Sequence, residues 1–304
     1  MNILVTGGAG FIGKHLVKFL IENKHNVSIL DNFSNSDKKS ISNFEKNQIK
    51  IIEGDIRDDK DILNATKDQD VVIHLAAKIS VEESVKNPSE TFGINVKGTE
   101  KILESCKKNG IKKIIVASSA AVYGEGDQQN KIKEESTLNP ISPYGESKIE
   151  MEKKIEKFCT ENKINYVILR FFNIYGKGQS KEYAGVITKF LEQIEKNEDL
   201  KIFGDGMQTR DFVGIEDIIN SIQNAMEYTE NGIFNIGSGK KITIKELAEL
   251  MISLSNKKLK IKFLNEKKGD IRNSHADIQL AKIELNYNSS NELKIGIEKF
   301  LNSN

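Results

Sequence analysis

The chain has few of the residues that build disulfide-bonded or metal-binding proteins. Its 304 residues include only two cysteines, Cys106 and Cys159, which lie far apart in separate stretches of helical pattern. A disulfide framework or a zinc site is therefore not expected, and a reducing compartment suits the protein. The four histidines form no cluster with metal-ligand spacing. We expect a cytoplasmic protein without a bound metal.

A strong net charge and long apolar segments are also missing. The formal net charge is +1, so no strong field attracts nucleic acid or an anionic membrane as a partner. Residues 1–5 predict a strand instead of a basic leader, and no stretch is apolar enough to suggest a transmembrane helix. With 38% hydrophobic and 29% charged residues, the composition is typical of a soluble globular protein of one or two domains.

A glycine-rich turn follows the first predicted strand. Residues 2–6 are mostly apolar, Gly7, Gly10 and Gly13 come next, and an amphipathic helix runs to about residue 24. In a dinucleotide site such glycines permit a tight turn, close approach of the backbone to the phosphates, and packing of helix on strand. The helix N-terminus also offers unpaired N–H groups to an anion. We predict a pyrophosphate site here; the alternative is a turn without a ligand.

An acidic residue follows where a nucleotide ribose would lie. Asp31, with Asn32 after it, ends the next predicted strand, about 20 residues past the glycines. A carboxylate there bonds the ribose hydroxyls and repels a 2′-phosphate, which favours NAD over NADP. Lys38 and Lys39 lie downstream and work against this preference.

Apolar strands alternate with helical patterns through the N-terminal half. Strands are predicted over residues 49–53, 71–74 and 113–117, and helices over 58–68 and 88–109. This alternation predicts a parallel sheet covered by helices on both faces, with ligands at the carboxyl ends of the strands.

Three residues at the end of the strand over 71–74 bear on the site. Ala76 and Ala77 are small enough for a flat cofactor to lie against them, although ordinary close packing explains them equally well. His74 is predicted to be a buried structural residue and not a catalyst.

Tyr144 and Lys148 share one face of a predicted helix. Ser142 can cap this helix and Pro143 suits its first turn, and apolar residues continue at helical spacing. An ammonium near a phenol favours the phenolate, so the pair can serve as a proton shuttle. Taken alone, the two residues also fit a surface tyrosine and a solvated lysine.

Together these motifs resemble one family along nearly the whole chain. The sequence is similar to the extended short-chain dehydrogenase/reductases, in particular to NAD-dependent nucleotide-sugar epimerases and dehydratases. The motifs that carry the resemblance lie at residues 6–13, 31–32, 54–58, 74–77, 95–99, 118–124, 143–148, 170–176 and 204–212.

The resemblance implies a fold and a cofactor. It implies a Rossmann-type, doubly wound α/β sheet in residues 1–172 and a smaller C-terminal α/β substrate domain in residues 173–304, with the chain able to cross between them. NAD is the implied cofactor: Asp55 and Ile56 would flank the adenine, and Phe172 would line the nicotinamide pocket. The other implied NAD-site residues are Gly7, Gly10, Phe11, Ile12, Gly13, Asp31, Asn32, Leu75, Ala76, Ala77, Asn95, Ser118, Tyr144 and Lys148.

The resemblance also implies three catalytic groups. Tyr144 would be the acid/base, Lys148 would hold the nicotinamide ribose, and Ser119 would bond the reacting sugar hydroxyl. A free phenol has a pKa of about 10, so Tyr144 needs its anion stabilised to act near neutrality. Lys148 and the nicotinamide ring can supply that stabilisation.

Ala120 and Ala121 discriminate between reactions. Related dehydratases are expected to carry Asp and Glu directly after the serine or threonine, and related decarboxylases a glutamate nearby; alanines carry no proton. We therefore expect 4-epimerisation, in which a 4-keto sugar forms transiently and no NAD is consumed. The alternatives are another redox outcome (5-epimerisation, dehydration, net oxidation or reduction) and a non-catalytic NAD-sensing protein.

The C-terminal part is expected to hold a UDP-sugar. Ser274 stands where some relatives place a tyrosine against the C2 substituent of the sugar. A small residue there predicts room for an N-acetyl group, and so activity on N-acetylated UDP-hexosamines as well as on UDP-glucose and UDP-galactose. The alternative is that Ser274 is an ordinary loop residue. The implied substrate residues are Ser119, Tyr144, Asn173, Val186, Phe203, Arg210, Lys267, Asp270 and Ser274.

Three points remain open in this half. Lys267 replaces an arginine that grips the diphosphate in many relatives, and lysine lacks the planar fork. Arg210 is predicted to bind the diphosphate, and the alternative is that it forms a surface ion pair with Asp211 or Glu216. A homodimer through helices around residues 88–109 and 143–163 is an expectation from the family.

Overall fold

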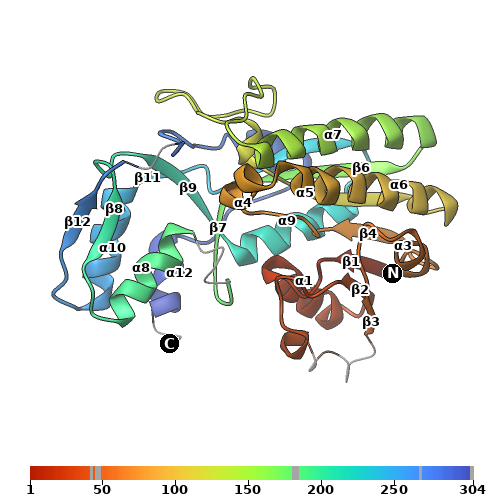
Figure 1. Cartoon of the computed structure of the whole chain (residues 1–304), viewed down its shortest axis with the longest axis horizontal. Helices are drawn as coiled ribbons and strands as arrows, with labels where there is room; N and C mark the ends of the chain where they lie inside the picture. Colours follow the sequence, from red (N-terminus) through yellow and green to blue (C-terminus); the bar gives the residue numbers. More distant parts are fainter. Residues whose placement is uncertain (42–43, 45–48, 180–184, 267–268, 302–304) are drawn as a thin grey trace.

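The computed structural model has a larger lobe built on a sheet and a smaller lobe at the opposite end (Figure 1). The structure describes the chain except residues 42–43, 45–48, 180–184, 267–268 and 302–304. Lys267, which was predicted to bind substrate, lies outside the described residues.

Seven parallel strands form the central sheet, in the order β10-β6-β5-β4-β1-β2-β3. The strand order runs outward in both directions from β1, which confirms the predicted doubly wound parallel sheet. The strands are β1 (Asn2–Thr6), β2 (Asn26–Asp31), β3 (Lys50–Glu53), β4 (Val71–His74), β5 (Lys113–Ser119), β6 (Asn165–Phe171) and β10 (Gly232–Ile236).

Helices cover both faces of this sheet. Along β1, Ile3 and Val5 pack with α1 and α9, whereas Leu4 packs with α3, α6 and α7, because successive side chains of a strand point to opposite faces. The helices are α1 (Phe11–Glu22), α3 (Asp59–Ala65), α6 (Thr99–Lys108), α7 (Pro143–Asn162) and α9 (Ile215–Glu227).

The helix predicted over residues 88–109 is confirmed as a continuous helical run over residues 88–108, which contains a π-helical turn. After the short helix α4 (Val81–Lys86), the chain forms α5 (Pro88–Phe92), a π-helical segment η2 (Gly93–Gly98) and then α6. π-Helical turns are frequent at functional sites. Asn95, predicted to support the cofactor site, lies in this segment.

The smaller lobe has two small sheets and its own core. In this core, Ile187 and Phe190 of α8 pack with Leu247 and Met251 of α10 and with Ile297 of α12. The elements are β7 (Asn173–Tyr175), β9 (Thr209–Gly214) and β11 (Lys241–Thr243) in one sheet, β8 (Leu200–Phe203) and β12 (Ile261–Leu264) in the other, with helices α8 (Val186–Glu195), α10 (Ile244–Ser255) and α12 (Leu293–Leu301).

The chain crosses between the lobes more than once. Residues 215–236 return to the large sheet as α9 and β10, where β10 pairs with β6. Residues 273–277 then lie along 126–132, joined by backbone hydrogen bonds such as that from the Ile132 N–H to the His275 carbonyl at 2.8 Å. Substrate-side residues are thereby tied to the lobe that carries β5 and α7.

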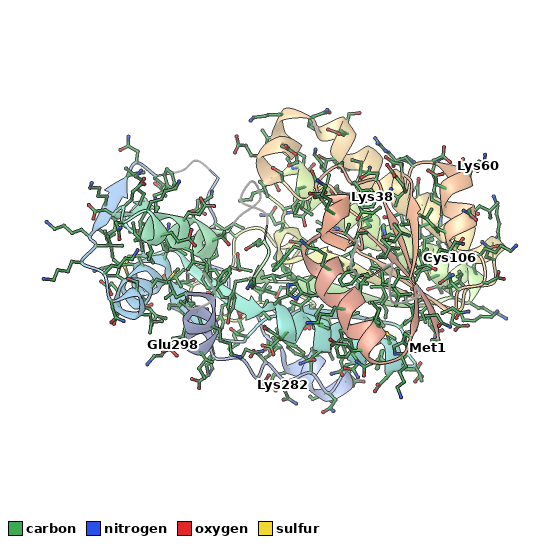
Figure 2. The ribbon with its side chains drawn as sticks, turned by 90° about the horizontal axis from the view of Figure 1, so that it is seen from below. Met1, Lys38, Lys60, Cys106, Lys282 and Glu298 are labelled. Carbon is green, nitrogen blue, oxygen red and sulfur yellow. The ribbon has the colours of Figure 1, made fainter. Side chains whose placement is uncertain are left out.

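The two cysteines lie in the interior, and charged side chains lie at the surface. Cys106 and Cys159 are free, buried thiols between the sheet and helices α6 and α7, whereas Lys60 and Lys282 project at the surface (Figure 2). Across the described residues, no helix is both long and apolar enough to span a bilayer.

Candidate functional site

A cavity of about 280 Å³ opens at the carboxyl ends of β1, β2 and β4. This is the edge at which parallel sheets bind nucleotides. Twelve of the residues predicted at the NAD site line it: Gly7, Gly10, Phe11, Ile12, Gly13, Asp31, Asn32, Asp55, Ile56, Leu75, Ala76 and Ala77.

The glycine turn is shaped by contacts that exclude a side chain. Gly7 has a φ of +70°, and a Cβ there would lie 2.8 Å from the Ala76 nitrogen. A Cβ on Gly13 would lie 2.3 Å from the Gly7 carbonyl oxygen, so α1 packs directly on the turn. Gly10 caps α1 without a side-chain hydrogen bond, which leaves the helix N-terminus open towards the cavity.

The acidic residue at the end of β2 is held by backbone donors. Its carboxylate accepts from the Ala9 N–H at 2.9 Å and from the Phe33 N–H at 2.8 Å. These bonds fix the Asp31 carboxylate at the cavity wall, where a ribose diol would meet it. Lys38, whose positive charge was expected to weaken the preference for NAD over NADP, pairs with Glu53 at 2.8 Å.

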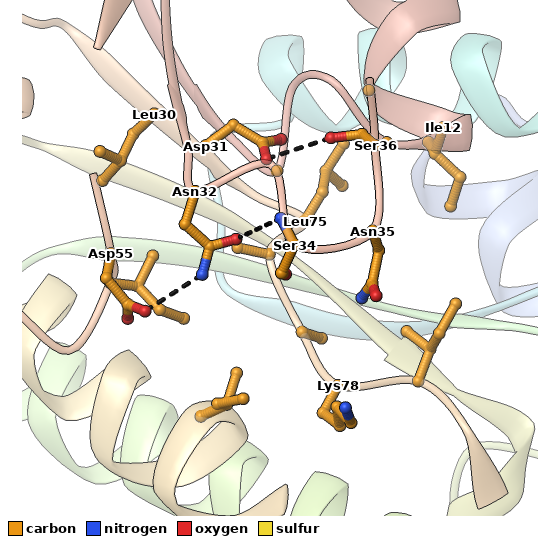
Figure 3. Close-up of a pocket in the computed structure, with 18 of the residues that line it drawn as sticks. Ile12, Leu30, Asp31, Asn32, Ser34, Asn35, Ser36, Asp55, Leu75 and Lys78 are labelled. Atoms are coloured by element: carbon orange, nitrogen blue, oxygen red, sulfur yellow. Dashed lines mark hydrogen bonds between the residues drawn. The ribbon is translucent and has the colours of Figure 1, made fainter. Parts of the chain in front are cut away.

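Asn32 connects the segment after β2 to Asp55, which is predicted to flank the adenine. Figure 3 shows its side chain between Ser34 and Asp55, bonded to each at 3.1 Å. Asp55 also receives the Arg57 guanidinium at 2.9 and 2.7 Å, and this contact holds the pKa of Asp55 at about 2. Arg57 lines the cavity but was not singled out from the sequence, because only the folded turn brings it against the cofactor site.

Asn95 connects the cavity to α7. Its side chain exchanges hydrogen bonds with the Lys78 backbone, at 2.8 Å to the N–H and 3.0 Å to the carbonyl, and donates to the Ser147 hydroxyl at 2.9 Å. Asn95 thus fixes the segment after β4 against the helix that carries Tyr144. Its predicted supporting position fits these contacts.

The predicted catalytic groups meet where β5 ends against α7. Burial raises the pKa of Tyr144, and a hydrogen bond with Ser119 opposes that rise. The Lys148 ammonium donates to the Ala117 carbonyl at 2.9 Å and lies 6.0 Å from the centre of the Tyr144 ring. Burial lowers the pKa of Lys148 to about 8. A phenol, a hydroxyl and a titratable ammonium are therefore adjacent.

The start of α7 forms as the sequence predicted. The Ser142 hydroxyl accepts from the Gly145 N–H at 3.2 Å, and Pro143 occupies the first turn. A Cβ on Gly145 would lie 2.5 Å from the Ala121 carbonyl oxygen, so glycine permits the helix to approach the turn after β5. This approach brings Tyr144 to Ser119.

Two buried polar residues beside the site have structural partners. His74 is 2% exposed and bonds to Thr6 and Thr99 at 2.7 and 2.9 Å, which confirms its predicted structural place. The Ser118 hydroxyl donates to the carboxylate of Glu152. Contact between Ser118 and NAD stays a prediction.

Phe172 is buried beside Tyr123. It is 4% exposed, and its ring centre lies 6.5 Å from that of Tyr123. The described lining of the cavity does not include Phe172, so its place at the nicotinamide stays a prediction.

Two of the predicted substrate residues meet at the segment after β12. Arg210 pairs with Asp270 at 2.5 Å and donates to the Ile271 carbonyl at 2.6 Å. Its partner is therefore neither Asp211, which accepts from Ser238, nor Glu216. Two residues predicted to contact substrate are joined to each other.

Of the other predicted substrate residues, Asn173, Val186 and Phe203 lie in the smaller lobe, and Ser274 lies where the chain returns to the larger one. Asn173 donates to the Asp211 carbonyl at 3.1 Å, and Ser274 is 7% exposed in the segment along 126–132. Val186 begins α8, and Phe203 ends β8 with 46% of its surface exposed. The exposed ring of Phe203 is available to a planar base.

No three His, Cys, Asp or Glu side chains form a group able to hold a metal within the part of the chain that the structure describes. A model of the NAD dependent epimerase/dehydratase family matches residues 3–237.

The chain belongs to the NAD-dependent epimerase/dehydratase family. Among similar solved structures is the UDP-glucose 4-epimerase of Thermotoga maritima with UDP-glucose, 35% identical, with a TM-score of 0.94 over 99% of this chain and 98% of that one. The UDP-N-acetylglucosamine 4-epimerase of Methanobrevibacter ruminantium, in complex with UDP-N-acetylmuramic acid, is also 35% identical, with a TM-score of 0.94 over 99% and 97%.

A third similar structure bears on the cofactor. The UDP-glucuronic acid 4-epimerase of Bacillus cereus, with UDP-glucuronic acid and NAD, is 32% identical, with a TM-score of 0.92 over 99% and 98% of the two chains. This member of the epimerase/dehydratase family is accordingly an isomerase of the nucleotide-sugar 4-epimerase group and uses NAD. The glycine turn, the fixed carboxylate of Asp31 and the alanines after β4 fit that cofactor.

Proposed function

We propose that the enzyme interconverts the C4 epimers of a UDP-hexose, UDP-glucose with UDP-galactose and also their N-acetylated counterparts. The observation that carries this proposal is the meeting of Tyr144, Ser119 and Lys148 at the end of β5, beside the NAD cavity. Similar enzymes solved with UDP-glucose and with a UDP-N-acetyl sugar support UDP as the carrier.

NAD held in this cavity would supply the redox chemistry, in which the C4 hydride is removed and later returned to the opposite face of the sugar. Tyr144 takes the proton of the C4 hydroxyl, and Ser119 orients that hydroxyl by hydrogen bonding. Burial raises the pKa of Tyr144, so the phenolate needs the positive charge of Lys148 nearby. Between the two hydride transfers, the same tyrosine returns the proton to the new alcohol.

The turn after β5 disfavours elimination of water. Ala120 and Ala121 form this turn directly after Ser119, and neither can donate or accept a proton. Elimination needs an acid for the departing hydroxyl and a base for the adjacent carbon. A simple 4-keto cycle is therefore the reaction that these residues support.

The proposal is tested with purified protein and no added NAD. We expect interconversion of UDP-glucose with UDP-galactose and of the N-acetylated pair, without accumulation of NADH. UDP-glucuronic acid is tested in parallel, because a similar structure holds it. Failure to interconvert any C4 pair would contradict the proposal, and NADH formed in proportion to product would indicate net oxidation.

Ser274 provides a prediction about the sugar. Replacing Ser274, which is 7% exposed, with tyrosine should fill space beside the C2 substituent. We expect kcat/KM for the N-acetylated substrates to fall at least about tenfold relative to UDP-glucose. Ser274→Ala, which adds no volume, is the matched control. Equal losses on both kinds of substrate would contradict the assigned pocket.

We also propose a homodimer through the outer faces of α6 and α7. The two helices pack side by side, and their partly exposed side chains include the ion pair of Lys154 with Glu100 at 3.0 Å. Support for the dimer comes from the family resemblance.

A further inference from the structure

A buried ion pair lies one helical turn beyond Lys148. Glu152 on α7 accepts from Arg170 Nε at 3.1 Å and from Nη2 at 2.7 Å. The Arg170 and Glu152 side chains are 4% and 3% exposed. Burying two charges costs free energy that their attraction often fails to offset, so such a pair is weak evidence for stability. Its surroundings indicate what it holds in place.

The pair belongs to a network that spans several elements. Arg170 Nη1 donates to the Tyr123 hydroxyl at 2.7 Å and to the Glu134 carbonyl at 2.9 Å. The Tyr123 hydroxyl donates to Asn235 Oδ1 at 2.7 Å. Since β6, β10 and the turn after β5 all contribute, the carboxylate of Glu152 is anchored from the side of the sheet.

Three residues of α7, spaced one turn apart, hold the end of β5. Tyr144, Lys148 and Glu152 lie in one row of the helix, because residues four apart share a face. Each of them bonds to a different residue of the segment 117–119. In the same order, these bonds are with the Ser119 side chain, the Ala117 carbonyl oxygen (2.9 Å) and the Ser118 hydroxyl.

Glu152 is also the negative charge that acts on Lys148. Burial lowers the pKa of Lys148 to about 8, and the charge of Glu152 opposes that decrease. The other groups around the ammonium are Tyr144 on α7, His74 on β4 and, behind Glu152, Arg170 on β6. Burial lowers the pKa of His74 to about 3, so its charge does not change near pH 8.

We propose that Glu152 is a positioning residue of the reaction. Through Ser118 it holds the segment that carries Ser119 against α7, and its negative charge lies one helical turn from the Lys148 ammonium, on the same face of α7. The role rests on the proposed function.

The test uses the holoenzyme and the pH dependence of kcat. In the wild type, the alkaline loss of activity should follow Lys148, whose pKa is about 8. Glu152→Gln keeps the shape of the side chain and removes the charge, so the pKa of Lys148 should fall and the alkaline limb should move about one pH unit lower. Glu152→Asp keeps the charge and should leave this limb in place while kcat falls.

A second variant isolates the hydrogen bond. Ser118→Ala keeps every charge and frees the end of β5, so kcat should fall roughly tenfold with an unchanged pH profile and little change in KM. Glu161→Gln is the control: it removes an exposed carboxylate from the last turn of α7 and should leave both kcat and the profile as in the wild type.

The outcomes separate the two claims. Superimposable profiles for the wild type and Glu152→Gln would overturn the role of the charge, and wild-type kcat in Ser118→Ala would overturn the role of the hydrogen bond. If Glu152→Gln does not fold, Ser118→Ala decides the role of the hydrogen bond, and a wild-type alkaline limb that does not lie near pH 8 overturns the role of the charge. A wild-type enzyme that interconverts no sugar pair contradicts the proposed function and this role with it, whereas an active wild type with unaltered variants contradicts this role alone.

Discussion

Replacing Tyr144 with phenylalanine is expected to lower kcat about a thousandfold while the protein retains its NAD. The substitution removes the phenol that exchanges the C4 proton and leaves Ser119, whose hydroxyl is a poor base. The Lys148 bond to the Ala117 carbonyl does not depend on that phenol, so the cofactor site should persist. The measurements are the rate of C4 interconversion and the NAD content of the purified protein.

Tyr166 supplies a matched control for this prediction. It is 9% exposed, as Tyr144 is, and lies on β6 in the core cluster beneath α7. Tyr166→Phe removes the hydroxyl of a tyrosine that, as a residue, is as buried as Tyr144 and lies outside the NAD cavity, and kcat should stay within about twofold of the wild type. Wild-type turnover by Tyr144→Phe would remove Tyr144 from the mechanism.

The second large effect is expected at Gly13. In Gly13→Ala the new Cβ would lie 2.3 Å from the Gly7 carbonyl oxygen and 2.6 Å from the Gly8 Cα. Both contacts are with backbone, so α1 must move away from the turn that cradles the pyrophosphate. We expect at least a tenfold loss of retained NAD and a decrease of about 1–3 kcal/mol in the free energy of unfolding. NAD content and denaturant unfolding measure the two effects.

Gly93→Ala is the control for added volume. A Cβ at Gly93 meets nothing within 4 Å, and its backbone is helical. Alanine there should leave NAD content unchanged and stabilise the protein slightly, since alanine loses less backbone entropy in a helix. Equal NAD loss in Gly13→Ala and Gly93→Ala would show that the close packing at Gly13 is not the cause of the loss.

Much of the cofactor half could be predicted because its signals are local. The glycine turn is flanked by a strand and a helix, and Asp31 ends the next strand, so short stretches of sequence specify both features. The face shared by Tyr144 and Lys148 follows from helical spacing alone. The family resemblance, together with the two alanines after Ser119, then favoured 4-epimerisation over dehydration.

Other features depend on contacts between residues far apart in the sequence, which local sequence patterns do not predict. The π-helical turn inside the helix over residues 88–108 is formed where Asn95 bonds to the Lys78 backbone and to Ser147 of α7, and helical periodicity predicts the helix but not this turn. Arg210 was predicted as a diphosphate ligand or as a surface partner of Asp211 or Glu216. Its pairing with Asp270, 60 residues away, required the segment after β12 to lie beside β9.

The sequence by itself determined the parallel α/β fold, the NAD turn and the tyrosine–lysine pair, because periodicity, glycine placement and capping act over a few residues. Only the tertiary structure decided that β10 completes the large sheet and that Glu152 links Ser118 to Arg170 beneath the catalytic groups. The network extends from Tyr123 to Asn235, which are 112 residues apart. Such contacts depend on strand order and on shared burial, which no local pattern specifies.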